Sequence, residues 1–96
     1  MYDQRLAYIT LASDAANAIP DDVEELMFWP LLNLDEGGPF VWGLWKTPYG
    51  WVVMEYYPTH AHWICNTGVE SREDGIAFVR GWMQDFAPDW FKLYFP

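Results

Sequence analysis

The sequence predicts an α+β fold in which helices pack on one face of a three- to four-stranded antiparallel sheet, in the order α-α-β-β-β-α-β. Apolar residues recur at helical spacing near both ends of the chain, whereas aromatic and β-branched residues fill its middle. Proline and glycine separate these segments. We expect residues 1–96 to form a single compact acidic domain, because a chain of this length supports one core.

The first quarter of the chain predicts two helices. Over residues 3–18, apolar side chains recur at spacings of three and four, which places them on one helical face. These side chains are Leu6, Ile9, Ala12, Ala16 and Ile19. Pro20 is expected to end this helix. Residues 21–26 predict a second, short helix, because Asp21 followed by Glu24 resembles a capping box.

The middle of the chain predicts an antiparallel sheet. Residues 40–46 and 51–57 are aromatic and β-branched, and the connection between them contains proline and glycine, as hairpin turns do. A shorter third strand is expected at 62–66. Both faces of these strands are apolar, so either helices cover both faces or one face is a partner surface. Two helices cannot easily cover both faces, which favours the partner surface.

The last quarter predicts one well-defined helix. Ser71 and Asp74 resemble a capping box, and acidic residues in a first turn favour the helix dipole. Apolar residues follow at helical spacing. They are Ile76, Val79, Met83 and Phe86. Pro88 follows the helix, and residues 91–95 are expected as a last edge strand or an ordered tail.

The chain is both strongly acidic and strongly aromatic. Its net charge is −9, and 20% of its residues are Phe, Trp or Tyr. Direct contact with nucleic acid needs clustered Lys and Arg, and the five present are scattered. Anionic membrane surfaces are disfavoured for the same reason. No apolar stretch is long enough to span a membrane, and the first residues lack the pattern of a signal peptide, so we expect a cytoplasmic protein.

The acidic residues form three local groups that we predict to bind a partner. The groups are Asp21, Asp22, Glu24 and Glu25; Asp35 and Glu36; and Glu70, Glu73 and Asp74. Capping of helices accounts for some of these residues, but not for the scarcity of compensating Lys and Arg. Because a high net charge destabilises a compact protein through self-repulsion, the charge is expected to serve binding to a basic surface.

A histidine and cysteine group is the other candidate for chemistry. His60 and His62 share a strand parity and can face the same way, whereas Cys65, the only cysteine, has the opposite parity. No further ligand pattern completes a tetrahedral metal site, and no known catalytic motif is present. We therefore expect two exposed turn histidines and one buried thiol, with no cofactor, no metal and no enzymatic activity.

The whole-chain character is similar to that of a known class. In its size, in its acidic groups at 21–25, 35–36 and 70–74, and in the absence of catalytic motifs, the chain resembles small phage-encoded inhibitors of the anti-CRISPR type. The resemblance implies a stoichiometric inhibitor in the cytoplasm of a bacterial host. Its carboxylates would occupy the Lys and Arg that normally hold phosphates. The implied partner is a basic protein or ribonucleoprotein complex, such as a CRISPR effector.

Other functions remain open from the sequence. An immunity protein that neutralises a basic toxin nuclease would use the same physical logic. A small metal-binding or enzymatic module would use His60, His62 and Cys65. A carbohydrate-binding module would use the aromatic side chains for stacking. A homo-oligomer that buries the second sheet face would account for the aromatic residues without a foreign partner.

Overall fold

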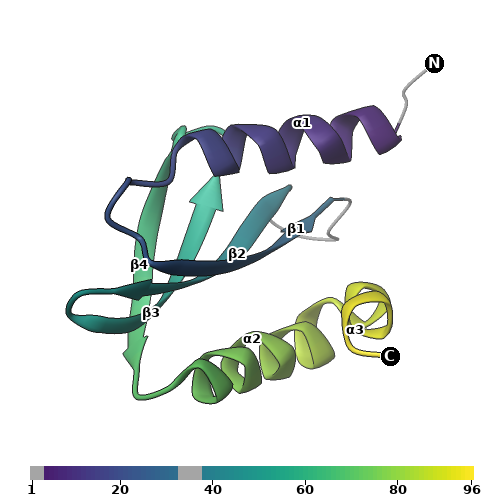
Figure 1. The fold of residues 1–96 in the computed structure, drawn as a ribbon. Helices are drawn as coiled ribbons and strands as arrows, with labels where there is room; N and C mark the ends of the chain where they lie inside the picture. The colour runs from purple at the N-terminus through teal and green to yellow at the C-terminus, as the bar shows by residue number, and fades with distance from the viewer. Residues whose placement is uncertain (1–3, 33–37) are drawn as a thin grey trace.

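A four-stranded antiparallel sheet forms the middle layer of the molecule, with helices on both of its faces (Figure 1). The computed structural model describes residues 4–32 and 38–96. The elements are α1 (Gln4–Asn17), β1 (Glu25–Leu31), β2 (Phe40–Thr47), β3 (Gly50–Tyr57), β4 (His62–Val69), α2 (Arg72–Phe86) and α3 (Pro88–Tyr94). The predicted α+β class and antiparallel sheet are confirmed, whereas the order of elements is α-β-β-β-β-α-α.

The sheet is a simple meander in which each strand pairs with the next one along the chain. The β2–β3 hairpin closes where Thr47 pairs with Gly50, whose positive φ of 122° suits glycine. The Thr47 hydroxyl also donates to the Gly50 carbonyl at 2.9 Å. The third predicted strand is longer than expected, because an irregularity between Val53 and Met54 lets β4 continue to Val69.

The predicted short helix at residues 21–26 is wrong. Residues 21 and 22 form a turn, and an edge strand begins at Glu25. Aromatic and aliphatic residues follow, and they pair with β2 from Glu25–Lys46 to Leu31–Phe40. This long-range pairing, with burial of the strand's second half, overrides the local capping signal of the acids. Pro30 is tolerated because β1 lies at the edge of the sheet, where a missing N–H breaks no ladder.

The expected edge strand at residues 91–95 is a helix instead. Pro88 occupies the first turn of α3, where its fixed φ favours a helix start. Four aromatic side chains of α3 and its C-terminal cap then fall on one side and pack against the main core. They are Trp90, Phe91, Tyr94 and Phe95. The spacing of these residues is helical rather than alternating, which the sequence interpretation overlooked.

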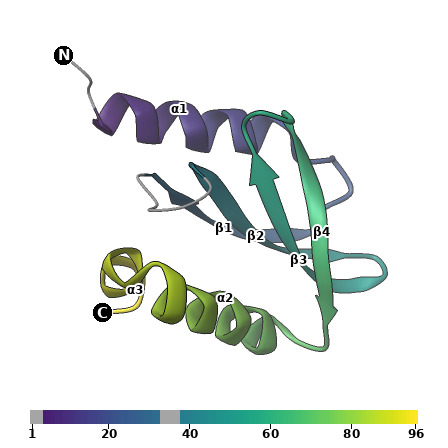
Figure 2. The same ribbon diagram turned by 180° about the vertical axis from the view of Figure 1, so that it is seen from behind.

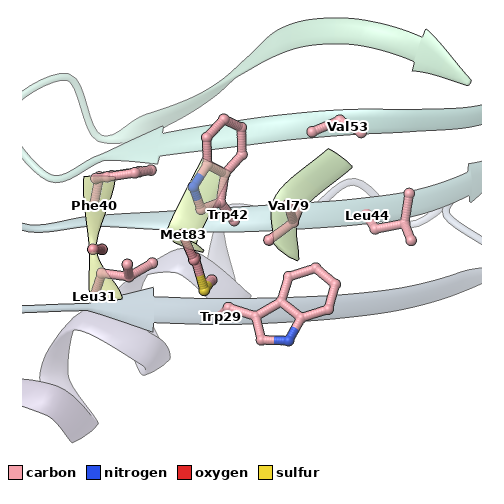
Figure 3. Packing of buried hydrophobic residues seen from close by; sticks show 9 residues of the cluster. Trp29, Leu31, Phe40, Trp42, Leu44, Val53, Val79 and Met83 are labelled. Atoms are coloured by element: carbon pink, nitrogen blue, oxygen red, sulfur yellow. The ribbon is translucent and has the colours of Figure 1, made fainter. Parts of the chain in front are cut away.

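Helices cover both faces of the sheet, so the prediction of one covered face is also wrong (Figures 1 and 2). The larger buried cluster lies between the sheet and α2 (Figure 3). It contains Trp29, Leu31, Phe40, Trp42, Leu44, Val53, Val79, Met83 and Ala87. A smaller cluster lies between the sheet and α1, and contains Leu11, Ala15, Leu32, Val41 and Tyr56. Because β2 alternates apolar residues on both sides, each face needs its own cover.

The buried face of α1 differs from the predicted one. Leu11 and Ala15 are buried, whereas Leu6 and Ile9 are 62% and 61% exposed. The small Ala15 allows close packing, and its carbonyl accepts a hydrogen bond from the Trp63 indole of β4 at 2.9 Å. Trp63 therefore holds the C-terminal half of α1 on the sheet.

Helix α2 approaches the sheet closely at Gly75. This residue is buried, and a methyl group added there would collide with the side chain of Leu44 on β2. At Gly81, further along the same helix, an added methyl group would meet nothing within 4 Å. The two glycines of α2 thus have different physical roles.

We predict that Gly75→Ala lowers the free energy of unfolding by about 1–3 kcal/mol, because the new methyl group must displace Leu44 in a close-packed core. Gly81→Ala should instead raise it by up to about 1 kcal/mol, since alanine favours a helix over glycine. Urea denaturation of both variants measures the difference. Equal effects at the two positions would contradict the close approach of α2 to β2.

Candidate protein interface

The meander brings two distant acidic segments to one end of the sheet. The residues Glu25, Lys46, Trp51 and Val69 are successive partners across the four strands. The segment before β1 and the segment after β4 therefore flank the same end of the sheet as the β2–β3 hairpin (Figure 1). Neighbouring strands lie about 4.8 Å apart, so the two outer strands are about 14 Å apart at this end. We call this region, residues 20–25, 46–51 and 69–74, the acidic end.

The acids at 21–25 are exposed and have little structural role. They do not cap a helix, because none begins there. Within the described parts of the chain, the side chains of Asp21, Asp22 and Glu25 make no hydrogen bond or ion pair. Glu24 lies 3.9 Å from the ammonium group of Lys46, and both side chains are about half exposed. Such an exposed pair contributes little to stability.

The acids at 70–74 have a partial structural explanation. The Ser71 hydroxyl caps α2 by accepting a hydrogen bond from the Asp74 backbone N–H at 3.1 Å, as the capping pattern predicts. Glu73 and Asp74 lie in the first turn of α2, where the helix dipole favours negative charge. Glu70 precedes the cap and is exposed.

Seven of the nine acids predicted to bind a partner thus share one end of the molecule. The described cations there are Lys46 and Arg72. Asp35 and Glu36 complete the predicted set but lie outside the described residues. The sequence did not predict that the groups at 21–25 and 70–74 lie at the same end of the molecule, because this placement depends on β1 being a strand.

A shallow hollow of about 320 Å³ lies within the acidic end. It is lined by Glu25, Leu26, Met27, Trp51 and Arg72. Trp51 packs against the main core, but it is only half-buried and forms part of this surface. A half-buried tryptophan beside carboxylates is well suited to the stem and charge of an incoming Lys or Arg, through apolar contact and cation–π attraction.

The histidines and the cysteine do not form one site. The rings of His60 and His62 lie 5.9 Å apart, and His62 Nδ1 lies 2.7 Å from the carbonyl oxygen of His60. Cys65 is exposed, not buried as expected, because none of the described helices covers the β4 edge of the sheet. Among the described residues, no three His, Cys, Asp or Glu side chains are placed to hold a metal ion.

The aromatic side chains of the sheet and of α2 differ in their burial. Trp42 and Trp45 are buried, whereas Trp63 and Trp82 are half-buried and Phe78 is 38% exposed. Phe86, on the same side of α2, is 69% exposed and packs against Trp82 with ring centroids 5.4 Å apart. The helices therefore cover both faces incompletely, which agrees with the small size of the chain.

Helix α3 closes the opposite end of the sheet through hydrogen bonds to β1. The Tyr94 hydroxyl donates to the carbonyl of Pro30 at 2.7 Å, and the Trp90 indole donates to the carbonyl of Leu32 at 2.8 Å. Because the single proton of Tyr94 is used, the Tyr8 hydroxyl of α1 donates to Tyr94, at 2.9 Å. Burial raises the pKa of Tyr94 well above its usual range.

A mostly apolar groove of about 440 Å³ runs between α1 and α3. Tyr8, Ile9, Trp90 and Leu93 form most of its apolar lining. The rings of Tyr8 and Trp90 stack with centroids 6.4 Å apart. This groove explains why Ile9 is exposed, because it lines the groove and does not contact the sheet.

Comparisons with models of protein families, with curated proteins and with solved structures find no match for this chain. Within residues 4–32 and 38–96, no helix has the length and apolar character needed to cross a membrane.

We predict that the double variant Asp21→Lys/Asp22→Lys folds and is more stable than the wild type at low salt, by about 0.5 kcal/mol. The two carboxylates lie in a field of like charge and make no stabilising contact among the described residues. Thermal unfolding at low and high NaCl measures the difference, which should shrink as salt screens the charges. A variant less stable than the wild type would show that these acids hold the turn together.

We predict that stability falls as the pH rises above about 10, the usual pKa of tyrosine. The unfolded chain then releases the proton that native Tyr94 keeps, so the unfolded state binds fewer protons and is favoured. The free energy of unfolding should fall by up to about 1.4 kcal/mol per pH unit from this residue.

Tyr94→Phe tests this assignment. It should cost about 1–2 kcal/mol at neutral pH through its lost hydrogen bonds and should flatten the alkaline decline. The matched control is Tyr49→Phe, which removes a hydroxyl from a ring that is 100% exposed at the hairpin tip. Urea denaturation between pH 8 and pH 11 measures both variants, and an unchanged slope in Tyr94→Phe would contradict the assignment.

Proposed function

We propose that this protein is a non-enzymatic, stoichiometric inhibitor that binds a basic, nucleic-acid-binding protein surface through its acidic end. One observation carries the proposal. Topology gathers the acids at 21–25 and 70–74 at one end of the sheet, and the first group has no capping role that would explain its charge. A feature that costs stability and lacks a structural function is best explained by binding.

The number of charges at the acidic end is similar to the number of phosphates that a nucleic-acid-binding surface contacts. A DNA-binding surface commonly neutralises about six to ten phosphates. The acidic end presents seven carboxylates, carried by exposed side chains of Asp21, Asp22, Glu24, Glu25, Glu70, Glu73 and Asp74. Carboxylate and phosphate both pair with arginine through short, often bidentate hydrogen bonds. The acidic end can therefore compete for the same cations as a nucleic-acid backbone.

Rigid placement of the charges supports this proposal. Backbone bonds to β2 hold Glu24 and Glu25, and the capped helix α2 holds Glu73 and Asp74, so the separation of these acids is set by the fold. A pre-organised array loses less entropy on binding than a flexible acidic tail. The hollow beside Trp51 adds an apolar centre, which is where binding energy concentrates in protein interfaces.

The proposed target is a basic protein or ribonucleoprotein complex that normally holds nucleic acid, with a CRISPR effector as the example that the anti-CRISPR resemblance suggests. An immunity protein for a basic nuclease would use the same surface. The identity of the captured partner distinguishes the two, since one is a host-defence complex and the other a toxin. In both cases binding excludes nucleic acid by occupying its site.

We predict that Asp21→Lys/Asp22→Lys weakens partner binding by about tenfold or more, because attractive charge pairs become repulsive. The partner is first captured from a bacterial lysate at low salt, released at high salt, identified and purified. Its affinity for wild type and variant is then measured by titration at several salt concentrations. The variant should also show a shallower salt dependence.

The matched control is Asp85→Lys/Asp89→Lys, which changes the net charge equally but near the junction of α2 and α3, away from the acidic end. This control should bind the partner with an affinity within about twofold of that of the wild type, because it weakens only the long-range electrostatic attraction. Short oligonucleotides should compete with wild-type protein for the partner. Equal loss in both double variants, or binding that oligonucleotides do not affect, would contradict the proposal.

A further inference from the structure

Helix α2 leaves one corner of the sheet uncovered on its own side. The helix begins beside the C-terminal end of β4 and runs toward α3, away from the N-terminal end of β4 (Figure 2). Val53 of β3 packs under α2, and side chains alternate along a strand, so Glu55 and Tyr57 face the same side. Ile64 of β4 pairs with Glu55 and shares this side. We call these three residues, with Asn66, the open corner.

Three rings of α2 border the open corner. Phe78, Trp82 and Phe86 recur at a spacing of four residues, which places them along one side of the helix. Phe78 and Phe86 are exposed, and Trp82 is half-buried. The ring centroid of Trp42 on β2 lies 5.8 Å from that of Phe78 and 5.3 Å from that of Trp82. Trp42 also pairs with Glu55 across β2 and β3, so the rings adjoin the carboxylate.

The carboxylate of Glu55 is held in place by neutral groups. It accepts a hydrogen bond from the Tyr57 hydroxyl at 3.1 Å and one from the Asn66 side-chain amide at 3.3 Å. A carboxylate offers about four acceptor positions, so about two remain open. Among residues 4–32 and 38–96, no lysine or arginine pairs with Glu55. The open corner thus holds a half-buried negative charge without a cation.

We propose that the open corner binds an arginine side chain of a partner protein, with the guanidinium on Glu55 and the rest of the side chain against Phe78 and Trp82. The charges are complementary, because aromatic faces and a carboxylate both attract a cation. Arginine uses both features at once, since its planar group stacks on rings and forms paired hydrogen bonds with a carboxylate. An anion would be repelled by Glu55, and an apolar occupant would bury that charge unpaired.

The extent of the apolar surface favours a protein segment over a free guanidinium compound. Ile64 is exposed beside Glu55, and Phe86 continues the row of rings beyond Trp82. Contiguous exposed apolar surface of this kind marks sites of protein interaction. The open corner lies toward the opposite end of β3 from Trp51, so this inference goes beyond the proposed function of the acidic end and does not rest on it.

Nuclear magnetic resonance of the intact protein tests the site with the peptide Gly-Arg-Gly, capped at both ends. Titration should shift the indole N–H signal of Trp82 and the side-chain amide signal of Asn66 until both saturate. The same peptide with citrulline, a neutral analogue of arginine, should bind at least about tenfold more weakly. The Trp51 indole reports separately on peptide bound at the acidic end, and Asp21→Lys/Asp22→Lys should weaken only that signal.

Three variants assign the contacts. Glu55→Gln keeps the size of the side chain and should weaken binding at the open corner at least about fivefold. Asp14→Asn removes the same charge from an exposed position of α1, across the sheet, and should leave this binding unchanged. Phe78→Leu keeps an apolar side chain without the ring and should weaken binding about two- to fivefold. The backbone amide spectrum of each variant shows whether the fold is kept.

The proposal is overturned if the arginine peptide shifts the signal of Trp51 but not those of Trp82 and Asn66. It is also overturned if the citrulline peptide binds equally well, or if Glu55→Gln binds as tightly as the wild type. Saturable shifts of Trp82 and Asn66 that are lost in Glu55→Gln support it, even if the acidic end captures no partner. Failure of this site and failure of the proposed function are therefore distinguishable.

Discussion

Strand β2 imposes the constraint on which the rest of the structure depends, because it is apolar on both sides. Val41 and Trp45 face α1, whereas Trp42 and Leu44 face α2. A central strand of this kind must be covered twice, and the chain provides one helix before the sheet and another after it. The requirement is met at a cost. The indole N–H groups of Trp42 and Trp45 are buried without a hydrogen-bond partner among the described residues, which costs about 1–3 kcal/mol each.

Covering both faces also determines where charge can reside. Helices occupy the space above and below the sheet, so exposed acids concentrate beyond the ends of the strands and on outer helix surfaces. A meander with an even number of strands begins and finishes at the same end. The segments before β1 and after β4 are therefore neighbours, although more than 40 residues separate them in the sequence. The acidic end follows from the number of strands as much as from the acidic residues themselves.

Much of this architecture could be predicted from local patterns, and the exceptions have a common cause. The β2–β3 hairpin and the Ser71 cap of α2 depend on neighbouring residues, and both were predicted correctly. Strand β1 was missed because the acids at its start favour a helix locally, while its pairing with β2 lies outside any sequence window. The acidic residues of the candidate site could be named from sequence, but their grouping could not, because it requires β1.

The exposed face of α1 illustrates the same limit. Leu6 and Ile9 have helical spacing and mark one apolar face of the helix, yet the helix turns Leu11 and Ala15 toward the sheet. Periodicity identifies a helix but does not choose between two apolar stripes when both are present. The choice is made by Trp63 of β4, whose indole holds the Ala15 carbonyl.

The distribution of structural roles among the acids strengthens the case for binding. A serine cap followed by acids in the first turn is common at the start of a helix. Glu73 and Asp74, which follow the Ser71 cap, therefore say little about function on their own. Asp21 and Asp22 belong to a turn that other polar residues would form equally well, and their repulsion by the acids of α2 opposes folding. Selection for stability alone would not keep both of them at this end. Their position at the acidic end, which also holds Trp51 and the hollow, is explained by a partner whose cations gain more from the carboxylates than the fold loses by keeping them.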